Sequence, residues 1–271
     1  EFFPFWGGDP CFLDVETADP SDLKVLFFNE KGLAFISSNP ERTQKKLEAM
    51  GLKLPEKASD AIAFTVATSS KPRPLQANWP PQTVADILKW QEELDPQARK
   101  EIERRLLRAC IQRKSPAVCV VKSPLMQYAF WADIHGGVKV SPAKALANAR
   151  AHMLAAKVHP MWATRIDDQY VSQRNTPGRP TLAGKRIALV GCGTIGGFVA
   201  DLQVKAGAGL AGGELLLVDP DSLMPHNVGR HRLGLNYALQ KKATARRTEL
   251  QLGAPTANLK DMPGRGQDAD L

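Results

Sequence analysis

The stretch that decides the fold of this chain reads Arg186-Ile187-Ala188-Leu189-Val190-Gly191-Cys192-Gly193-Thr194-Ile195-Gly196-Gly197. An apolar run of strand length ends in a Gly-x-Gly-x-x-Gly turn, and a helix is expected to follow over 194–206. A second apolar run predicts a strand at 214–218, followed by a helix at 238–252 and a short strand near 256–259. This strand–helix–strand order predicts a Rossmann-like parallel βαβ unit, and therefore an α/β fold.

The glycine turn has the chemistry of a phosphate site. Glycines have no Cβ, so Gly191, Gly193 and Gly196 let the backbone turn tightly and approach a ligand closely. A helix that begins at Thr194 and Ile195 offers free N–H groups and a partial positive charge. The turn therefore predicts a nucleotide site, and the alternative is a close strand-to-helix turn without a ligand.

Two acidic residues follow the second predicted strand. Asp219 lies directly after it, where a carboxylate can accept hydrogen bonds from ribose hydroxyls. Asp221 is equally suited to bonding a ribose hydroxyl and to capping the next segment. The glycine turn and the first acid together fit NAD, FAD or ATP.

The next segment separates these ligands. It contains Asn227, Arg230 and Lys242, which a dinucleotide dehydrogenase does not need at these places. A site that cleaves a phosphate anhydride needs fixed cations, and arginine and lysine supply them in different geometries. Each residue also has a plainer reading: Lys242 as a surface lysine, Asn227 as a turn residue, and His231 as a packed side chain.

Residues 186–243 resemble the start of a ThiF/MoeB-type adenylation domain, the domain of ubiquitin-activating enzymes. The resemblance rests on the glycine turn, Asp-x-Asp at 219–221, Asn-x-x-Arg at 227–230 and the lysine twelve residues later. The Arg-His-x-Leu-Gly form at 230–234 is similar to bacterial members, including the activating and conjugating fusion proteins of anti-phage operons. An enzyme of the adenylyltransferase class is therefore expected.

The resemblance implies roles for these positions. The implied reaction is ATP-dependent adenylation of the C-terminal carboxylate of a ubiquitin-like or sulfur-carrier protein, with Mg2+. Arg230 and Lys242 are the implied catalytic cations, and loss of Arg230 should depress turnover more than ATP affinity. A further arginine from before the first strand, sometimes across a dimer interface, is best matched by Arg174, and a homodimer is expected. The expected ATP-binding residues are Gly191, Gly193, Thr194, Ile195, Gly196, Asp219, Asp221, Asn227, Arg230, Lys242 and Arg174.

A lone βαβ unit does not bury both faces of its sheet, so a further strand is expected beyond Leu271. In the family, the magnesium-binding aspartate and the thioester cysteine also lie after a later strand. The first residues, Glu1-Phe2-Phe3-Pro4, lack a starting methionine. We therefore expect a piece of a longer protein that is inactive on its own.

Three regions are expected along the chain. Residues 1–135 are expected to form a small mixed α/β domain, which is either conjugating-enzyme-like or a linker. Residues 136–180 are expected to form a helical and extended connector, and residues 181–271 the first part of the adenylation domain. The breaker at 175–180 marks the last boundary. Strands are expected at 23–28, 33–36, 62–66, 117–121, 127–132 and 159–165, and helices at 40–50, 83–94, 141–157 and from 96 onward.

Composition limits the remaining classes. The net charge is +8, but Lys and Arg are interleaved with Glu, which favours solvated helix faces and makes nucleic acid an unlikely partner. The sequence contains no run of 18 apolar residues, so no membrane span is expected. The four cysteines form no metal spacing or disulfide framework, which favours a cytoplasmic protein. Cys110 and Cys119 are expected in the core, and Cys11, in loop-like surroundings, is the weak candidate nucleophile.

Two other functions stay open at this point. One is a Rossmann-fold oxidoreductase that uses NAD or FAD. The other is a non-catalytic scaffold that retains the adenylation fold.

Overall fold

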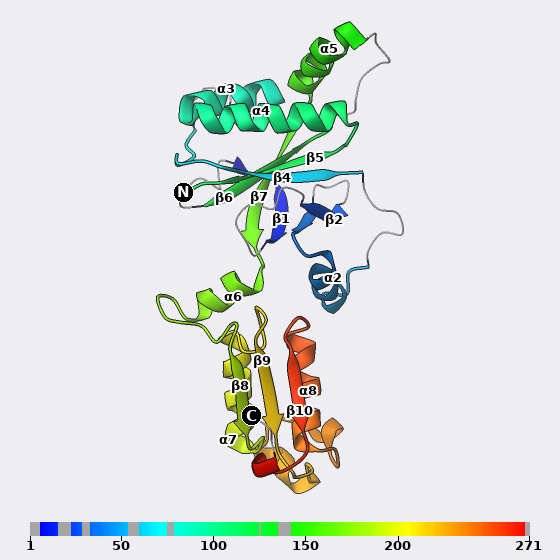
Figure 1. The fold of residues 1–271 in the computed structure, drawn as a ribbon, viewed down its shortest axis with the longest axis vertical. Helices are drawn as coiled ribbons and strands as arrows, with labels where there is room; N and C mark the ends of the chain where they lie inside the picture. Colours follow the sequence, from blue (N-terminus) through cyan, green and yellow to red (C-terminus); the bar gives the residue numbers. More distant parts are fainter. Residues whose placement is uncertain are drawn as a thin grey trace. The chain divides into compact units, whose positions relative to one another are not determined.

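The computed structural model describes residues 6–15, 23–28, 33–53, 60–74, 79–124, 126–134 and 142–268. Contacts between residues divide the chain into two units. The first comprises Glu1–Pro40 and Leu54–Ile166, and the second comprises Glu41–Lys53 and Asp167–Leu271. Both combine helices with strands (Figure 1), which confirms the expected α/β class.

The first unit is built on a seven-stranded mixed sheet with the order β2-β3-β1-β7-β6-β5-β4. Three neighbouring pairs, β1–β3, β1–β7 and β4–β5, run parallel, and the others run antiparallel. The strands predicted between residues 23 and 132 are all present, and residues 29–32 between the first two lie outside the described residues. The strands are β1 (Asp9–Asp14), β2 (Lys24–Phe28), β3 (Ala34–Ser37), β4 (Ile62–Ala67), β5 (Ala117–Lys122), β6 (Gln127–Ala132) and β7 (Val158–Arg165).

Helices α3 (Val84–Leu94) and α4 (Pro96–Ile111) cover one face of this sheet, and α5 (Pro142–Ala155) packs against them (Figure 1). Ile87 of α3 and both Ile102 and Leu106 of α4 are fully buried. Burying one such side chain contributes about 1.5–3 kcal/mol. The helical spacing of these apolar residues is therefore what places α3 and α4 on the sheet.

Side chains close the starts of both helices. The Thr83 hydroxyl accepts a hydrogen bond from the Asp86 amide at 3.2 Å, and the Asp86 carboxylate accepts one from the Thr83 amide at 2.9 Å. Asp95, directly before α4, accepts from the amides of Gln97 at 3.0 Å and Ala98 at 3.2 Å. These caps satisfy N–H groups that the first turn of a helix leaves without partners.

Strand β1 is a feature that the sequence pattern did not predict. It is an inner strand that pairs with β3 and β7, although it is short and contains Pro10. Cys11 lies in it and is fully buried, so the expected loop-like setting of Cys11 is wrong. Burial also raises the pKa of the Cys11 thiol, which disfavours the nucleophilic thiolate. Cys110 and Cys119 are buried, as expected.

Strand β7 confirms the extended conformation expected for 159–165. It pairs with β1 and β6, so part of the segment expected as a connector completes the first sheet. Contacts change from the first unit to the second between Ile166 and Asp167. The sequence pattern did not show that β7 belongs to the first sheet, because strand pairing depends on segments that are distant in the sequence.

The second unit contains a three-stranded parallel sheet with the order β10-β9-β8. Two successive strand–helix–strand crossovers build it, which confirms the predicted βαβ arrangement. Ala200, Leu215, Leu217 and Leu250 join the two helices to the sheet in one buried cluster. The elements are β8 (Arg186–Val190), α7 (Thr194–Lys205), β9 (Glu214–Val218), α8 (Lys242–Gly253) and β10 (Leu259–Met262).

Shorter elements complete the second unit. Helix α2 (Pro40–Ala49) forms where a helix was predicted at 40–50. It belongs mostly to the second unit and not to the first, and Lys46 lies 2.7 Å from Asp168 in an ion pair. Asp168 begins α6 (Asp168–Asn175), a helix that the sequence pattern did not predict. Three 3-10 helices are η1 (Pro225–Arg230), η2 (Leu235–Tyr237) and η3 (Gly266–Asp268).

Helix α8 begins at Lys242, and the expected start at 238 is wrong. The Leu223 amide donates to the Gln240 carbonyl at 2.8 Å, and the Leu239 amide donates to the Leu223 carbonyl at 2.7 Å. This pairing holds the segment before Lys242 in a bridge to residues 222–223. The tertiary hydrogen bonds therefore override the local helical pattern.

Candidate functional site

The candidate site lies at the carboxyl edge of the parallel sheet in the second unit. Val190 at the end of β8 is in register with Val218 at the end of β9. The Gly191 amide donates a hydrogen bond to the Val218 carbonyl at 2.7 Å, so the glycine turn begins directly beside the end of β9. In open α/β sheets, ligands bind outside the carboxyl ends of the strands.

The three glycines of the turn serve three different physical needs. Gly191 has a φ of +93°, a conformation that L side chains rarely adopt. A Cβ on Gly196 would lie 1.8 Å from the Gly191 carbonyl oxygen, so only glycine allows α7 to pack this closely. A Cβ on Gly193 would meet no atom within 4 Å. Gly193 is therefore the glycine that leaves space in front of the helix.

Helix α7 starts without a side-chain cap. Gly193 is its N-cap residue and has no side chain to accept hydrogen bonds from the first turn, where Thr194 and Ile195 are both exposed. Helix α8 also lacks a side-chain cap, at Lys241. Uncapped first turns present N–H donors and a partial positive charge, which suits an anionic ligand.

Asp219 holds the glycine turn in place. Its carboxylate accepts hydrogen bonds from the Cys192 amide at 2.7 Å and from the Asp221 amide at 2.8 Å, and its side chain is buried. Each carboxylate oxygen has two acceptor positions, so one remains on each. The structure thus places Asp219 in a supporting role, and ribose binding by the remaining positions stays a prediction.

Lys242 and Asp221 form an ion pair at this edge. Lys242 Nζ lies 2.9 Å from Asp221 Oδ2, and the lysine side chain is only 12% exposed whereas the aspartate side chain is 67% exposed. The ammonium group lowers the pKa of Asp221. A phosphate bound by Lys242 would therefore share this ammonium group with Asp221 or displace it.

Asn227 and Arg230 lie together on η1. The Arg230 guanidinium donates a hydrogen bond to the Asn227 side-chain oxygen at 3.1 Å, and this contact is exposed. Among the described residues, no carboxylate lies within ion-pair distance of Arg230. The guanidinium is therefore held by a neutral amide and keeps most of its donors for a ligand.

His231 points inward beside these residues. Both ring nitrogens are buried, and the Cys192 backbone lies close enough to act on the ring. Burial lowers the pKa of His231, and the neighbouring Lys242 ammonium group lowers it further. The ring is therefore neutral at pH 7, in agreement with its reading as a packed side chain.

Arg174 is not brought to this edge within one chain. A Cβ on Gly207, just after the end of α7, would lie 3.0 Å from Ser172 Oγ, so α6 lies at the amino edge of the sheet (Figure 1). The glycine turn is at the opposite end of α7, roughly 18 Å away for twelve helical residues. A phosphate contact by the exposed Arg174 would thus need a second chain.

Cys192 lies within the turn and is buried. Burial, with a smaller effect of Asp219, raises the pKa of Cys192 to about 12. This thiol is therefore unsuited to thioester chemistry.

The described residues contain no cluster of metal-binding side chains. No group of three or more His, Cys, Asp or Glu side chains in this part of the chain is placed to hold a metal ion. At the carboxyl edge, Asp219 is hydrogen-bonded to two amides and Asp221 is paired with Lys242. The Mg2+ implied by the resemblance is therefore not held by such a cluster among these residues, whereas magnesium sites with nucleotides commonly use only one or two carboxylates together with waters and phosphates. The same part of the chain contains no helix long and apolar enough to cross a bilayer.

A glycine turn between parallel strands, an acid after the second strand and cations at the same edge define a Rossmann-like adenylation fold. Residues 168–270 match the model of the ThiF family, and the chain carries a ThiF-family domain over this segment. The match begins at α6 and includes every element of the parallel sheet.

Two relatives extend this similarity. The chain is 42% identical over 273 residues to the ATP-dependent ubiquitin transferase-like protein Cap2 of Pseudomonas aeruginosa (strain BWHPSA011 / Pa011), covering 100% of this chain and 50% of that protein. It is 32% identical over 165 residues to the Cap2 protein of Escherichia coli (strain TW11681), covering 57% of this chain and 28% of that protein. The chain thus spans half the length of the Pseudomonas relative.

One solved structure with partial similarity is that of E. coli tRNA N6-threonylcarbamoyladenosine dehydratase, TcdA, in complex with ATP. The identity is 21% and the TM-score is 0.31, with 35% of this chain and 38% of that chain covered. No function is taken from a match of this extent.

Proposed function

We propose that this chain is part of an enzyme that uses ATP to adenylate the C-terminal carboxylate of a ubiquitin-like or sulfur-carrier protein. The observation that carries the proposal is the meeting of the open glycine turn, the uncapped starts of α7 and α8, and two cations at one sheet edge. The names of the Cap2 relatives, which describe ATP-dependent ubiquitin transferase-like proteins, support the same chemistry.

In the proposed reaction, a carboxylate oxygen of the carrier protein attacks the α-phosphorus of ATP. A bond forms between that oxygen and the α-phosphorus, the bond to the bridging oxygen of the β-phosphate breaks, and pyrophosphate leaves. A C-terminal carboxylate is already ionised at neutral pH, so the step needs no general base. Arg230 and Lys242 stabilise the charge that builds on the phosphates, while the α7 amides hold the nucleotide.

The supporting residues explain why this edge can be preorganised. Asp219 fixes the turn through the Cys192 amide, and Asn227 fixes the guanidinium of Arg230. Mutual positioning of this kind lowers the reorganisation needed at the moment of reaction. Asp221 holds Lys242 before the nucleotide arrives, and a bound phosphate then shares this ammonium group with Asp221 or displaces the carboxylate.

A second chain would supply Arg174. Because α6 lies at the amino edge of its own sheet, a homodimer is the arrangement that allows the Arg174 guanidinium to reach phosphates. The test is a mixture of Arg174→Ala and Arg230→Ala chains. Mixed dimers should contain one intact site and recover part of the activity that each variant lacks alone. Absence of recovery in dimers shown to be mixed would remove Arg174 from the site.

We also propose a cytoplasmic location, which the absence of a disulfide among the four cysteines supports. The similarity of its Arg-His-x-Leu-Gly segment to bacterial fusion proteins of anti-phage operons supports a role in such a system.

Two alternative functions make different predictions. An oxidoreductase would bind NAD or FAD at the same turn, but it has no use for the pair of cations after β9. A non-catalytic scaffold would retain the fold with weak or no nucleotide binding. The set of Asn227, Arg230 and Lys242 at one edge favours the adenylation function over both.

The deciding experiment is calorimetric titration with ATP–Mg2+ and with NAD+, on this chain and on the same gene extended past Leu271. Arg230→Ala should weaken ATP binding. In the extended protein, it should lower the rate of ATP–pyrophosphate exchange by a larger factor than it lowers the affinity for ATP. Arg247→Ala is the matched control, because Arg247 is paired with Asp261 at 2.6 Å. NAD+ binding without ATP binding would overturn the proposal, and binding of neither would favour the scaffold.

A further inference from the structure

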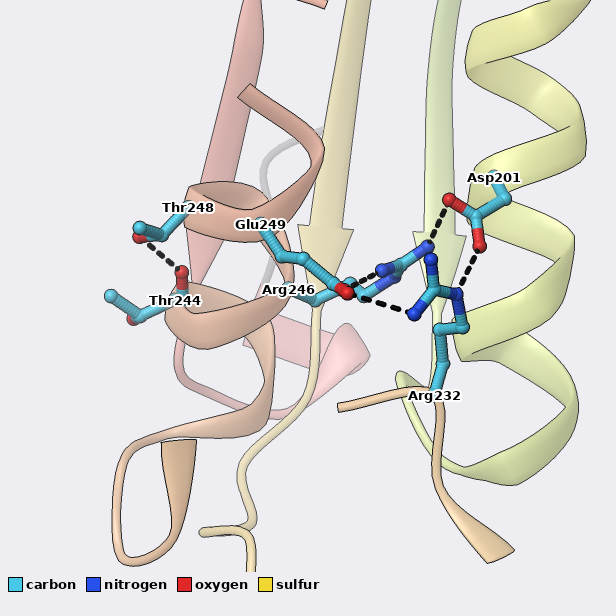
Figure 2. A network of polar contacts seen from close by, with 6 residues as sticks. All are labelled: Asp201, Arg232, Thr244, Arg246, Thr248 and Glu249. Atoms are coloured by element: carbon cyan, nitrogen blue, oxygen red, sulfur yellow. Dashed lines mark hydrogen bonds and ion pairs between the residues drawn. The ribbon is translucent and has the colours of Figure 1, made fainter. Parts of the chain in front are cut away.

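A closed network of four charges lies between α7, α8 and the segment after η1 (Figure 2). Asp201 of α7 lies 2.9 Å from Arg232 Nε through one oxygen and 2.7 Å from Arg246 Nη2 through the other. Glu249 of α8 lies 3.0 Å from Arg232 Nη1 and also contacts Arg246 Nη1. Each carboxylate therefore bridges the same two arginines.

Because this network is largely buried, its positive and negative charges must balance. Arg246 is fully buried, and the side chains of Asp201 and Glu249 are 23% and 20% exposed. A buried arginine requires a carboxylate, but two carboxylates around it carry one more charge than it balances. Arg232, which is 43% exposed, supplies the second positive charge and closes the network. The network is thus complete only when Arg232 is in place.

Arg232 also packs directly on α7 through its Cβ atom. A Cβ on Gly197 would lie 3.3 Å from the Arg232 Cβ, so a glycine in the first turn of α7 makes room for this segment. The contact joins the glycine-turn helix to the segment that carries Arg230 and His231. The position of one then depends on the position of the other.

The segment before Arg232 is held by Val228, which packs against a small apolar cluster, and by the inward-pointing His231. Helix η1, which carries Asn227 and Arg230, contains no buried residue among its six positions and has no side-chain cap. Leu223 before it and Leu233 after it are buried in a small apolar cluster. Arg232 adds a polar anchor on the side that faces α7.

We propose that Arg232 is a positioning residue, which locks the segment 225–232 onto α7 and α8 and thereby aims Arg230 at the phosphate site. It acts through the two carboxylates and not by contact with the nucleotide. The aiming of Arg230 at a phosphate rests on the proposed function, whereas the locking of the segment does not. This gives the two parts separate tests.

The first test measures hydrogen exchange of residues 225–233 in the protein without nucleotide. Arg232→Gln should speed exchange about fivefold, the scale expected when one ion-pair network is lost. Arg247→Gln is the control, because Arg247 of α8 pairs with Asp261 at similar exposure, and it should leave exchange in this segment unchanged. Equal exchange in wild type and Arg232→Gln would overturn the locking role.

The second test is a double-mutant cycle on ATP affinity with Arg232→Gln, Arg230→Gln and both together. Each single variant should weaken binding about five- to tenfold, and the double variant should bind no more weakly than Arg230→Gln. Independent, multiplying effects would overturn the proposal, because they would mean that Arg232 acts on the nucleotide directly. Arg232→Lys should recover only part of the affinity, since an ammonium group lacks the planar fork that joins two carboxylates.

If the wild-type protein binds no ATP, the proposed function fails, and the hydrogen-exchange comparison still decides whether Arg232 locks the segment. If ATP binds and the exchange is unchanged in Arg232→Gln, the proposed function stands and the positioning role fails.

Discussion

Helices α3 and α4 of the first unit begin differently from helices α7 and α8 of the second unit. In the first unit, Thr83 with Asp86 closes the start of α3, and Asp95 closes the start of α4. In the second unit, α7 begins at Gly193 and α8 at Lys241, and neither has a side-chain cap. Side chains accept hydrogen bonds from the first-turn amides of α3 and α4, and Asp167 does the same for α6 of the second unit. No side chain does so at the starts of α7 and α8, although the Lys242 amide of α8 donates to the Asp221 carbonyl at 2.9 Å. Open donors at the carboxyl edge of a sheet distinguish a binding site from a helix that only supports the fold.

The arginines differ in the same way. In α4, Arg104 and Arg105 both pair with Glu101, and Glu101 has its pKa lowered to about 2 by these guanidinium groups. Arg230 instead contacts the neutral amide of Asn227. The basic residues of α4 thus form the solvated, self-paired face that their interleaving with glutamates predicts.

The largest effect on stability is expected for Gly196→Ala, because the Cβ of an alanine at this position would overlap the Gly191 carbonyl. The unfolding free energy of the second unit should fall by about 3 kcal/mol or more. Gly193→Ala is the matched control, and its Cβ meets no atom within 4 Å, so the loss should stay below about 1 kcal/mol.

Urea unfolding can measure this difference with two signals. All five tryptophans lie at or before position 162, so fluorescence follows the first unit, and hydrogen exchange of β9 follows the second. Equal losses for the two glycine variants would show that close packing at Gly196 is not needed.

The next largest effect is expected for Gly193→Asp, which adds the kind of cap that the first unit uses. The carboxylate should stabilise α7 by about 0.5–1 kcal/mol. It should also weaken ATP binding by at least about tenfold, because it occupies the open donors with a negative charge. Calorimetry with ATP–Mg2+ checks the affinity, and an unchanged affinity would mean that the start of α7 is not the phosphate site.

A smaller effect is expected when a cap is removed from the first unit. Thr83→Ala should lower the unfolding free energy of that unit by about 1 kcal/mol, since the hydroxyl accepts the Asp86 amide. Thr83→Ser keeps the hydroxyl and should retain most of the stability. ATP affinity should be the same in all three proteins, and a change in Thr83→Ala would contradict the separation between the units.

The smallest effect is a pH dependence that arises from His231. Its pKa is lowered in the folded protein, so the unfolded chain binds more protons when the pH falls below the ordinary histidine value of about 6.5. The stability from the neutral ring is complete above this pH and decreases as the pH falls. His231→Gln should therefore flatten the decline in the melting temperature of the second unit between about pH 6.5 and 5. The same slope in both proteins would contradict this assignment.

The elements with strong local patterns were predictable. The apolar runs of β8 and β9, the glycine turn and the Thr83 capping box all carry their structural signal within a few residues. Strand β1 and helix α6 were missed because β1 is defined by pairing with β3 and β7, and α6 is a mainly polar segment capped by Asp167. Neither signal can be read from apolar periodicity.

The candidate site shows the same division. The identities and order of Gly191, Asp219, Arg230 and Lys242 follow from the sequence, because glycine conformations and side-chain charge are properties of single residues. The contacts between these and neighbouring residues do not follow from the sequence. Asp219 supports the turn, Asp221 pairs with Lys242, and Arg232 joins α7 to α8.

The sequence by itself therefore determined the class of the fold, the glycine turn and the chemical groups available at its edge. The tertiary structure alone decided which groups are engaged and which are open, and it placed Arg174 at the opposite edge from the turn. The physical reason is the distance along the chain over which each interaction acts. Backbone propensity and charge act locally, whereas hydrogen bonds, ion pairs and burial depend on which distant segments meet.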